Sequence, residues 1–288
     1  MKVAVTGASG FIAQHVCKAL LQEGHEVIGL DINPVENVWG QWFYADITKP
    51  LAPIPNLDAV IHLAALSHPR QCDADPAKAY AVNVAGTANV LKMALESGAR
   101  KVVFSSSAHV YDIPPKYMPS DEVHPLRLNN TYTTTKILGE QLCELYYQNH
   151  GLSYTTLRLF NAYGPNQQLG LFVPDMIEKA KVGPFTLNGA NTTKDFVFID
   201  DVARAFLLAL ETPFVGAINV GTGVESQLGD VAKLIFHAMG SELTCTNADR
   251  ATRMQADPTR AKRVLGWEPA ISLKEGLSVI CNSAKVAV

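Results

Sequence analysis

Short, uniformly apolar runs alternate with helical stretches along the first half of the chain, and this rhythm restricts the possible folds more than any other feature. The runs KVAVTG (2–7), DAVIHLAA (58–65) and YTTLRLF (154–160) have the length of β-strands, and helical stretches separate them. Strands that are apolar on both faces occur in parallel sheets covered by helices on both sides. The sequence therefore predicts an α/β fold with a doubly wound parallel sheet.

The strands expected from this rhythm lie in the first part of the chain. They are, in order, 2–7, 26–31, 42–46, 58–65, 101–107 and 154–160. After Asn161 the rhythm breaks, and prolines punctuate shorter elements that include helical runs such as DDVARAFLLALE. We therefore predict a domain over 1–161 that carries the sheet, and a smaller, partly interleaved lobe over 162–288 packed over one end of it.

Charge and cysteine content exclude several classes of protein. The 288 residues carry a formal net charge of −3, so no basic face for nucleic acid is expected. No apolar run reaches the length that spans a bilayer, so we expect no membrane segment. The five cysteines are scattered and form no CxxC pair, which indicates free thiols in a reducing cytoplasm and no metal site.

A glycine turn joins the first expected strand to the helix after it. Gly7, Gly10 and Ala13 form the pattern G-x-x-G-x-x-A. Glycine lets a backbone turn tightly and approach a pyrophosphate, and the N-terminus of the helix offers free N–H groups. The third position needs only a small residue, so alanine fits there. Alone, the pattern is a weak signal, because an ordinary tight strand-to-helix turn also explains it.

An acid at the end of the second expected strand favours the interpretation of the glycine turn as a dinucleotide site. Asp31 lies where a carboxylate accepts hydrogen bonds from an adenosine ribose and repels a 2′-phosphate. Ile32 and Asn33 follow it, and neither would attract that phosphate. The sequence thus predicts NAD rather than NADP. Asp46 and Ile47, after the third strand, either border the adenine or simply form a turn.

Ser107, Tyr132 and Lys136 form a candidate proton-transfer set. Tyr132 and Lys136 lie one helical turn apart and so share a face, and Ser107 ends the strand KVVFSSS. An ammonium group near a tyrosine favours the phenolate, which makes the tyrosine a usable base. The serine hydroxyl can hydrogen-bond a substrate oxygen and direct it toward Tyr132. We therefore predict that these three residues are catalytic.

At this point the chain resembles the extended short-chain dehydrogenase/reductase family, in its NAD-dependent sugar-nucleotide epimerase/dehydratase branch. The resemblance covers nearly the whole chain, and the motifs occur in the order typical of the family. The motifs are VTGASGFIA (5–13), HLAA (62–65), YAVNVAGT (80–87), FSSSAHVY (104–111), YTTTK (132–136), RLFNAYGP (158–165), DFVFIDDVARA (195–205), INVGTG (218–223) and DPTRAKRVLGWEP (257–269).

The resemblance implies a Rossmann fold, bound NAD and a nucleotide-sugar substrate. It assigns the cofactor to Gly7, Ser9, Gly10, Phe11, Ile12, Asp31, Asp46, Ile47, Ala64, Asn83, Tyr132 and Lys136. It assigns the sugar nucleotide to Asn161, Leu171, Phe172, Lys194 and Arg253. It further implies a homodimer in which the helices around Asn83 and Tyr132 form a four-helix contact.

The chain also departs from the branch at identifiable positions. Sugar-nucleotide 4,6-dehydratases usually carry Asp-Glu just after the serine, where this chain has Ala108 and His109. Lys194 stands where an arginine is usual, and it lacks the bidentate fork of a guanidinium. Positions 247–249 read Asn-Ala-Asp in place of an R-P-G-E pattern. His109 is either an additional acid or base near the sugar or a packed loop residue.

These observations favour an NAD-dependent nucleotide-sugar 4-epimerase that works through a transient 4-keto sugar. A 4-keto-sugar reductase using NAD(P)H would need the same three catalytic residues and remains the first alternative. A dehydratase is disfavoured by Ala108 and His109. A non-catalytic NAD-sensing regulator would need the glycine turn but not Ser107, Tyr132 and Lys136. The sugar, the nucleotide and the pathway are not encoded in motifs of this kind.

Overall fold

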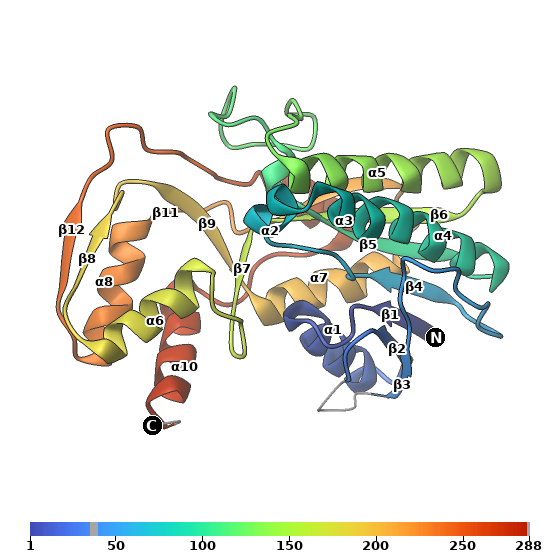
Figure 1. Ribbon diagram of the computed structural model, residues 1–288, viewed down its shortest axis with the longest axis horizontal. Coiled ribbons are helices and arrows are strands. Elements are labelled where there is room, and N and C mark those ends of the chain that lie inside the picture. Colours follow the sequence, from blue (N-terminus) through green and yellow to red (C-terminus); the bar gives the residue numbers. More distant parts are fainter. Residues whose placement is uncertain (35–39, 287–288) are drawn as a thin grey trace.

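A computed structural model describes residues 1–34 and 40–286 and contains a seven-stranded, fully parallel sheet (Figure 1). The strand order is β10-β6-β5-β4-β1-β2-β3. The chain thus builds outward from β1 in one direction, then in the other, which is the doubly wound arrangement that the sequence predicts. The strands are β1 (Lys2–Thr6), β2 (Glu26–Asp31), β3 (Gln41–Tyr44), β4 (Ala59–His62), β5 (Lys101–Ser107), β6 (Ser153–Leu159) and β10 (Gly216–Val220).

Helices cover both faces of this sheet because its strands are apolar on both sides. In β1, Val3 and Val5 face one core while Ala4 between them faces the other. In Figure 1, α1 (Phe11–Gln22) and α7 (Ile199–Glu211) lie below the sheet. The opposite layer contains α2 (Pro69–Ala74), α3 (Pro76–Tyr80), the π-helical turn Ala81–Ala85, α4 (Gly86–Glu96) and α5 (Thr131–His150).

A smaller lobe extends from one end of the sheet (Figure 1, left). It contains a three-stranded sheet, ordered β11-β9-β7, and a two-stranded sheet of β12 and β8. Its elements are β7 (Asn161–Tyr163), α6 (Phe172–Val182), β8 (Phe185–Asn188), β9 (Thr193–Phe198), β11 (Glu225–Gln227), α8 (Leu228–Met239), β12 (Leu243–Thr246) and α10 (Leu273–Val286). Helix α9 (Thr259–Leu265) instead packs against β10 and α7 of the larger part.

The two parts of the chain are interleaved. Strand β10 and helix α7 follow Asn161 in sequence, yet β10 pairs with β6 in the large sheet, and α7 packs beside α1. The strand rhythm did not reveal β10, because INVGTG is short and lies among elements of the lobe. The other six strands of the large sheet occur where the sequence predicts them, and the strands of the lobe were not predicted.

The carboxyl ends of the parallel strands meet at one edge of the sheet, which the lobe adjoins. Strand β1 pairs with β2 on one side and with β4 on the other, so the order of connection reverses there. Open α/β sheets bind ligands in the crevice beside such a reversal. The glycine turn, Asp31 and Ser107 all follow or end strands at this edge.

Candidate active site

A cavity of about 630 Å³ opens at this edge, within the usual range for ligand sites. It extends from the glycine turn to the first helix of the lobe, α6. The predicted site residues that line it are Gly7, Ser9, Gly10, Phe11, Ile12, Asp31, Asp46, Ile47, Ala64, Ser107, Tyr132, Lys136, Asn161, Leu171 and Phe172.

Three predicted contacts, Asn83, Lys194 and Arg253, lie outside the cavity wall. Asn83 is 3% exposed, and its amide bonds to Leu66 and to the Thr135 hydroxyl, so it fixes local structure. Arg253 forms a bidentate ion pair with Glu225 on the surface. Lys194 lies on β9 two residues from the cavity-lining Phe196, so strand alternation directs both side chains to the same face.

The glycine turn has the geometry that a pyrophosphate requires. Gly7 has φ +71°, and a Cβ atom there would lie 2.7 Å from the backbone nitrogen of Ala64. Only glycine therefore fits between β1 and the turn after β4. Gly10 precedes α1 and provides no side-chain cap. The first N–H groups of α1, at Phe11 and Ile12, are thus available to an anion, and the turn fits a dinucleotide cofactor.

Asp31 is held in a fixed orientation beside this turn. Its Oδ2 accepts hydrogen bonds from the backbone N–H of Ser9 at 2.9 Å and from the Ser9 hydroxyl at 2.8 Å. Its Oδ1 accepts from the backbone N–H of Asn33 at 2.9 Å. A carboxylate has about four acceptor sites, so these bonds leave capacity for a ribose hydroxyl. The sequence placed Asp31 here but did not reveal Ser9 as its partner.

Tyr132 and Lys136 project from the first turns of α5, and both are less than one-tenth exposed. Asn130 starts the helix with a capping box, because its side chain accepts from the N–H of Thr133 while Thr133 bonds back to Asn130. The Lys136 Nζ donates to the carbonyl of Ser105 at 2.7 Å. It also lies 5.9 Å from the centroid of the Tyr132 ring.

Burial shifts the pKa of both groups. It raises the pKa of Tyr132 to about 12, while a hydrogen bond with Ser107 acts in the opposite direction. It lowers the pKa of Lys136 to about 8. The spacing of Tyr132 and Lys136 predicts a lowered pKa for Tyr132. In the structure burial raises this pKa instead, because it removes water from the phenolate.

His109 lines the cavity next to Ser107, and its backbone N–H donates to the Ser107 hydroxyl at 3.2 Å. Burial, assisted by the nearby Lys194 ammonium, lowers the pKa of His109 to about 4. The imidazole is therefore neutral at neutral pH. Ala108 beside it is 1% exposed and packs in the core.

A buried hydrogen-bond chain that sequence reasoning missed connects the end of β1, just before the glycine turn, to helix α5. The Thr87 hydroxyl donates to the Asn83 carbonyl at 2.6 Å, so it accepts from Nε2 of His62 at 2.9 Å. The other ring nitrogen of His62 then accepts from the Thr6 hydroxyl at 2.7 Å. Asn83 continues the chain to Thr135. Burial lowers the pKa of His62 to about 3, so this arrangement holds one neutral tautomer. The motif HLAA was the available signal.

Two further observations concern the described part of the chain as a whole. Within residues 1–34 and 40–286, no group of three or more His, Cys, Asp or Glu side chains is arranged to hold a metal ion, and all cysteines are free. No helix within these ranges combines the length and the apolar character needed to cross a membrane.

Known proteins match this chain along its length. A model of the NAD dependent epimerase/dehydratase family matches residues 3–221. A putative UDP-glucose 4-epimerase of Methanocaldococcus jannaschii is 32% identical over 98% of this chain and 98% of its own. UDP-glucuronic acid decarboxylase 6 of Arabidopsis thaliana is 29% identical over 97% of this chain and 88% of its own.

The structural comparison agrees. The UDP-glucose 4-epimerase of Thermotoga maritima, solved with UDP-glucose, superposes with a TM-score of 0.90 at 28% identity, covering 100% of this chain and 99% of that one. This confirms the α/β fold class. Because the relatives include epimerases and decarboxylases, the choice of reaction depends on the residues around Ser107.

Proposed function

Because the chain belongs to the NAD-dependent epimerase/dehydratase family, we propose that it epimerises a nucleotide sugar at C4 through a transient 4-keto sugar. Its substrate class follows from the family, and its cavity contains a glycine turn, a fixed acid and a Ser-Tyr-Lys set. The observation that most favours epimerisation is that, among the described residues, no carboxylic acid lines the cavity next to Ser107. Among the described residues, the only carboxylic acids that line the cavity are Asp31 and Asp46, beside the glycine turn.

That observation weighs against elimination of water from C5 and C6, which needs one group to take the C5 proton and another to protonate the departing hydroxyl. Ala108 can do neither. His109 is neutral, and a single imidazole provides one such group and not two. Removal and return of a hydride at C4 needs only one base, and Tyr132 fills that role.

The proposed chemistry assigns one task to each residue. Tyr132 takes the proton from the sugar 4-hydroxyl and later returns it to the 4-oxygen, once the hydride that left C4 has been added back to the opposite face of the 4-keto sugar. Ser107 donates a hydrogen bond to the 4-oxygen and keeps it near Tyr132. Lys136 orients the nicotinamide ribose and adds positive charge near the phenolate. When bound, oxidised NAD supplies the hydride acceptor and a positive ring, which offsets the burial that raises the pKa of Tyr132.

Substrate contacts are proposed along the lobe side of the cavity. Asn161, Leu171 and Phe172 line it and would hold the sugar and the nucleotide. Lys194, which has a buried ammonium beside His109, would face the diphosphate. Arg253 would reach the same group only by exchanging its partner Glu225 for the phosphate.

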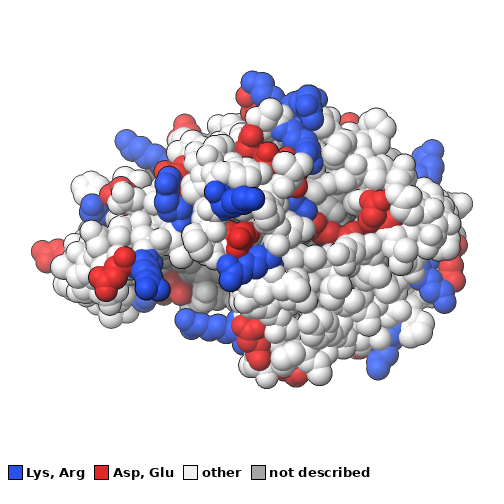
Figure 2. All heavy atoms as spheres, turned by 90° about the horizontal axis from the view of Figure 1, so that it is seen from above, with Lys and Arg blue, Asp and Glu red and all other residues white. Residues whose placement is uncertain are grey.

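We also propose that two copies of the chain pair through α3, α4 and α5. Exposed side chains of this layer include the uncharged residues Tyr80, Leu95 and Leu145, which is 50% exposed. Figure 2, seen from above these helices, shows broad areas without charged side chains. Sedimentation velocity would test this, with Leu145→Lys expected to shift a dimer toward monomer.

Product analysis tests the reaction. Incubation with UDP-, GDP-, dTDP- and CDP-hexoses should yield the C4 epimer of one of them, without added reductant. Mass spectrometry should show the mass of the substrate, and proton NMR should show inversion at C4. A product lighter by one water would overturn the argument from positions 108 and 109. An absolute need for NADH and a 4-keto substrate would instead identify a reductase.

A further inference from the structure

A buried ion pair joins α5, the helix that carries Tyr132 and Lys136, to strand β6. Glu140 is one helical turn beyond Lys136 on α5, and Arg158 is on β6. The guanidinium donates Nε to Glu140 Oε1 at 3.0 Å and Nη2 to Oε2 at 2.7 Å. The Arg158 side chain is 6% exposed, and the Glu140 side chain is 12% exposed. Such a bidentate pair is rigid, and neither member is needed to line the cavity.

Glu140 also reaches the end of the catalytic strand. The Ser106 hydroxyl donates to Glu140 Oε1 at 2.5 Å. Ser106 lies between Ser105, whose carbonyl accepts from Lys136, and Ser107. One carboxylate therefore connects α5 to the strand end that holds the Lys136 ammonium and the Ser107 hydroxyl.

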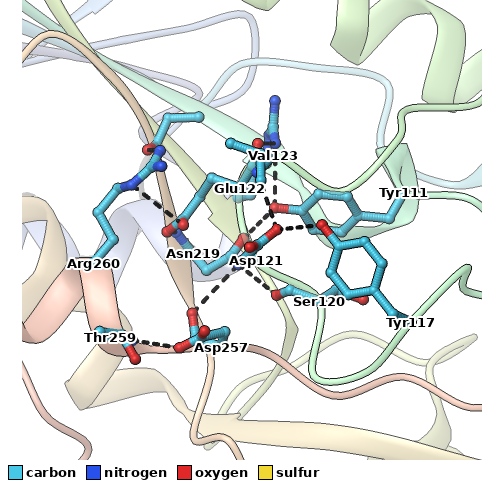
Figure 3. A network of polar contacts seen from close by, with 12 residues as sticks. Tyr111, Tyr117, Ser120, Asp121, Glu122, Val123, Asn219, Asp257, Thr259 and Arg260 are labelled. Carbon is cyan, nitrogen blue, oxygen red and sulfur yellow. Dashed lines mark hydrogen bonds and ion pairs between the residues drawn. The ribbon is translucent and has the colours of Figure 1, made fainter.

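Arg158 is itself anchored from the other side, which keeps Glu140 in place. Its Nη1 donates to the Tyr111 hydroxyl at 3.2 Å and to the carbonyl of Glu122 at 3.1 Å. Figure 3 shows how this network continues, with the Tyr111 hydroxyl donating to Asn219 and the Glu122 carboxylate pairing with Arg260. Elements that are distant in sequence thus hold the guanidinium.

Glu140 is the one acidic side chain among the groups that act on the Lys136 charge. On α5 these groups also include Tyr132 and the Cys143 thiol, and α2 contributes the Cys72 thiol. His62 of β4 faces Lys136 from the sheet and is neutral. Burial raises the pKa of both thiols, so they are protonated at neutral pH. The carboxylate is therefore the group that opposes the desolvation of the ammonium.

We propose that Glu140, held by Arg158, is a positioning residue of the active site that keeps the Lys136 ammonium charged and the end of β5 aligned with α5. The inference rests on the proposed roles of Tyr132 and Lys136. Without the carboxylate, Lys136 would lose its proton closer to neutral pH. The positive charge beside Tyr132 would then disappear, and the tyrosine would ionise less readily.

The test measures the charge of Lys136 directly, without a substrate. Protein labelled with ¹³C at the lysine ε-carbons is titrated by NMR, and the Lys136 signal is assigned by its loss in Lys136→Met. In the wild type this signal should titrate near pH 8. In Glu140→Gln it should titrate about one pH unit lower, the effect expected of a charge one helical turn away in a protein interior.

Two further variants make the result specific. Glu140→Gln leaves the buried Arg158 guanidinium without its counter-charge, which destabilises the fold. If this variant does not fold, the titration is made on the double variant Glu140→Gln/Arg158→Met. Arg158 is not among the groups that shift the pKa of Lys136, so the double variant should also titrate lower. The control is Glu144→Gln, the same change one turn further along α5, where the carboxylate bonds to Tyr154 and Gln148.

The control should titrate as the wild type does. An unchanged Lys136 titration in both Glu140 variants, or an equal shift in Glu144→Gln, would overturn the inference. If a substrate is known, the alkaline limit of turnover should move down with the NMR value. If no epimerase activity is found, the proposed function fails, and the titration still decides the role of Glu140.

Discussion

The Lys136 ammonium lies 5.9 Å from the centroid of the Tyr132 ring and donates its hydrogen bond to the Ser105 carbonyl. In the proposed chemistry the lysine would act on the tyrosine through its electric field. Ser107 acts on the same tyrosine, since burial raises the pKa of Tyr132 while a hydrogen bond with Ser107 lowers it. The proposed tasks are thus separate, since the serine would orient the acid–base group and the lysine would adjust its charge.

Tyr132→Phe should lower turnover by about 10²–10⁴, the usual contribution of general acid–base catalysis. The variant keeps the ring, so binding of NAD measured by fluorescence or calorimetry should survive. Tyr154→Phe is the matched control, because Tyr154 is also buried but its hydroxyl bonds to Glu144 outside the cavity. If Tyr132→Phe kept most of its turnover, the base would lie elsewhere, with His109 the next candidate.

Asp31→Asn should narrow the preference for NAD over NADP. In the wild type a 2′-phosphate would meet a carboxylate that Ser9 and Asn33 hold in place, so we expect NAD to bind at least about tenfold more tightly, which corresponds to about 1.4 kcal/mol. Dissociation constants for both cofactors provide the measurement. Equal values in the wild type would contradict the assignment of Asp31.

Asp46→Asn is the companion variant and separates the two interpretations of that residue. The Asp46 carboxylate accepts from the N–H and the hydroxyl of Thr48, and these bonds lower its pKa. These contacts are those of a turn residue at the edge of the cavity. The preference between NAD and NADP should therefore stay as in the wild type, and a change as large as that of Asp31→Asn would show a direct role in selecting the cofactor.

The parts of the fold that were predictable from sequence depend on local pattern. The apolar runs identify the strands from β1 to β6, because both faces of a parallel sheet are buried, except at the edge strand β3, which is mostly exposed. The spacing of Tyr132 and Lys136 places them on one face of a helix. Strand β10 escaped detection, because its place in the sheet depends on pairing with β6, whose sequence is distant.

The candidate site likewise combines features that local sequence predicts with features that depend on the whole fold. Gly7 and Asp31 were predictable, because the geometry that each provides depends on position within one strand–turn–helix unit. The raised pKa of Tyr132 was not, because it comes from burial by several elements at once. The ion pair between Arg253 and Glu225 could likewise not be predicted from the sequence, since β11 and the segment after β12 meet only in the folded lobe.

Gly7→Ala should weaken NAD binding and lower stability together. A Cβ atom would lie 2.7 Å from the Ala64 nitrogen and 2.8 Å from its Cα, so the turn after β4 must move. Gly24→Ala is the control, since Gly24 has φ +77°, close to that of Gly7, but has no atom within 4 Å of the added Cβ.

The control should therefore show only the backbone cost of a left-handed alanine, about 1–2 kcal/mol, and NAD affinity like that of the wild type. Gly7→Ala should unfold more readily than this control and bind NAD more weakly at temperatures where both are folded. Similar NAD dissociation constants for the two variants would show that the cofactor does not approach the Gly7 turn.

Lys136→Met should abolish turnover and, at neutral pH, stabilise the fold. Burial lowers the pKa of Lys136 from 10.5 to about 8, so between these values the unfolded chain binds more protons than the folded one. The free energy of unfolding of the wild type therefore rises with pH across that window, and the cost of the buried charge is greatest below pH 8. The full shift corresponds to about 3 kcal/mol, and loss of the hydrogen bond to Ser105 offsets about 1 kcal/mol of it.

Urea unfolding at a series of pH values checks this, and the difference between wild type and Lys136→Met isolates one group. We expect the variant to be more stable by about 2 kcal/mol at pH 7, with the difference shrinking as the pH rises from 8 toward 10.5. Lys101→Met removes another buried ammonium with a lowered pKa, at the opposite end of β5 and away from the cavity, and should keep its turnover. A Lys136→Met protein that is less stable than the wild type at pH 7 would mean that its bond to Ser105 outweighs desolvation, and that the lysine is retained for stability as well as for chemistry.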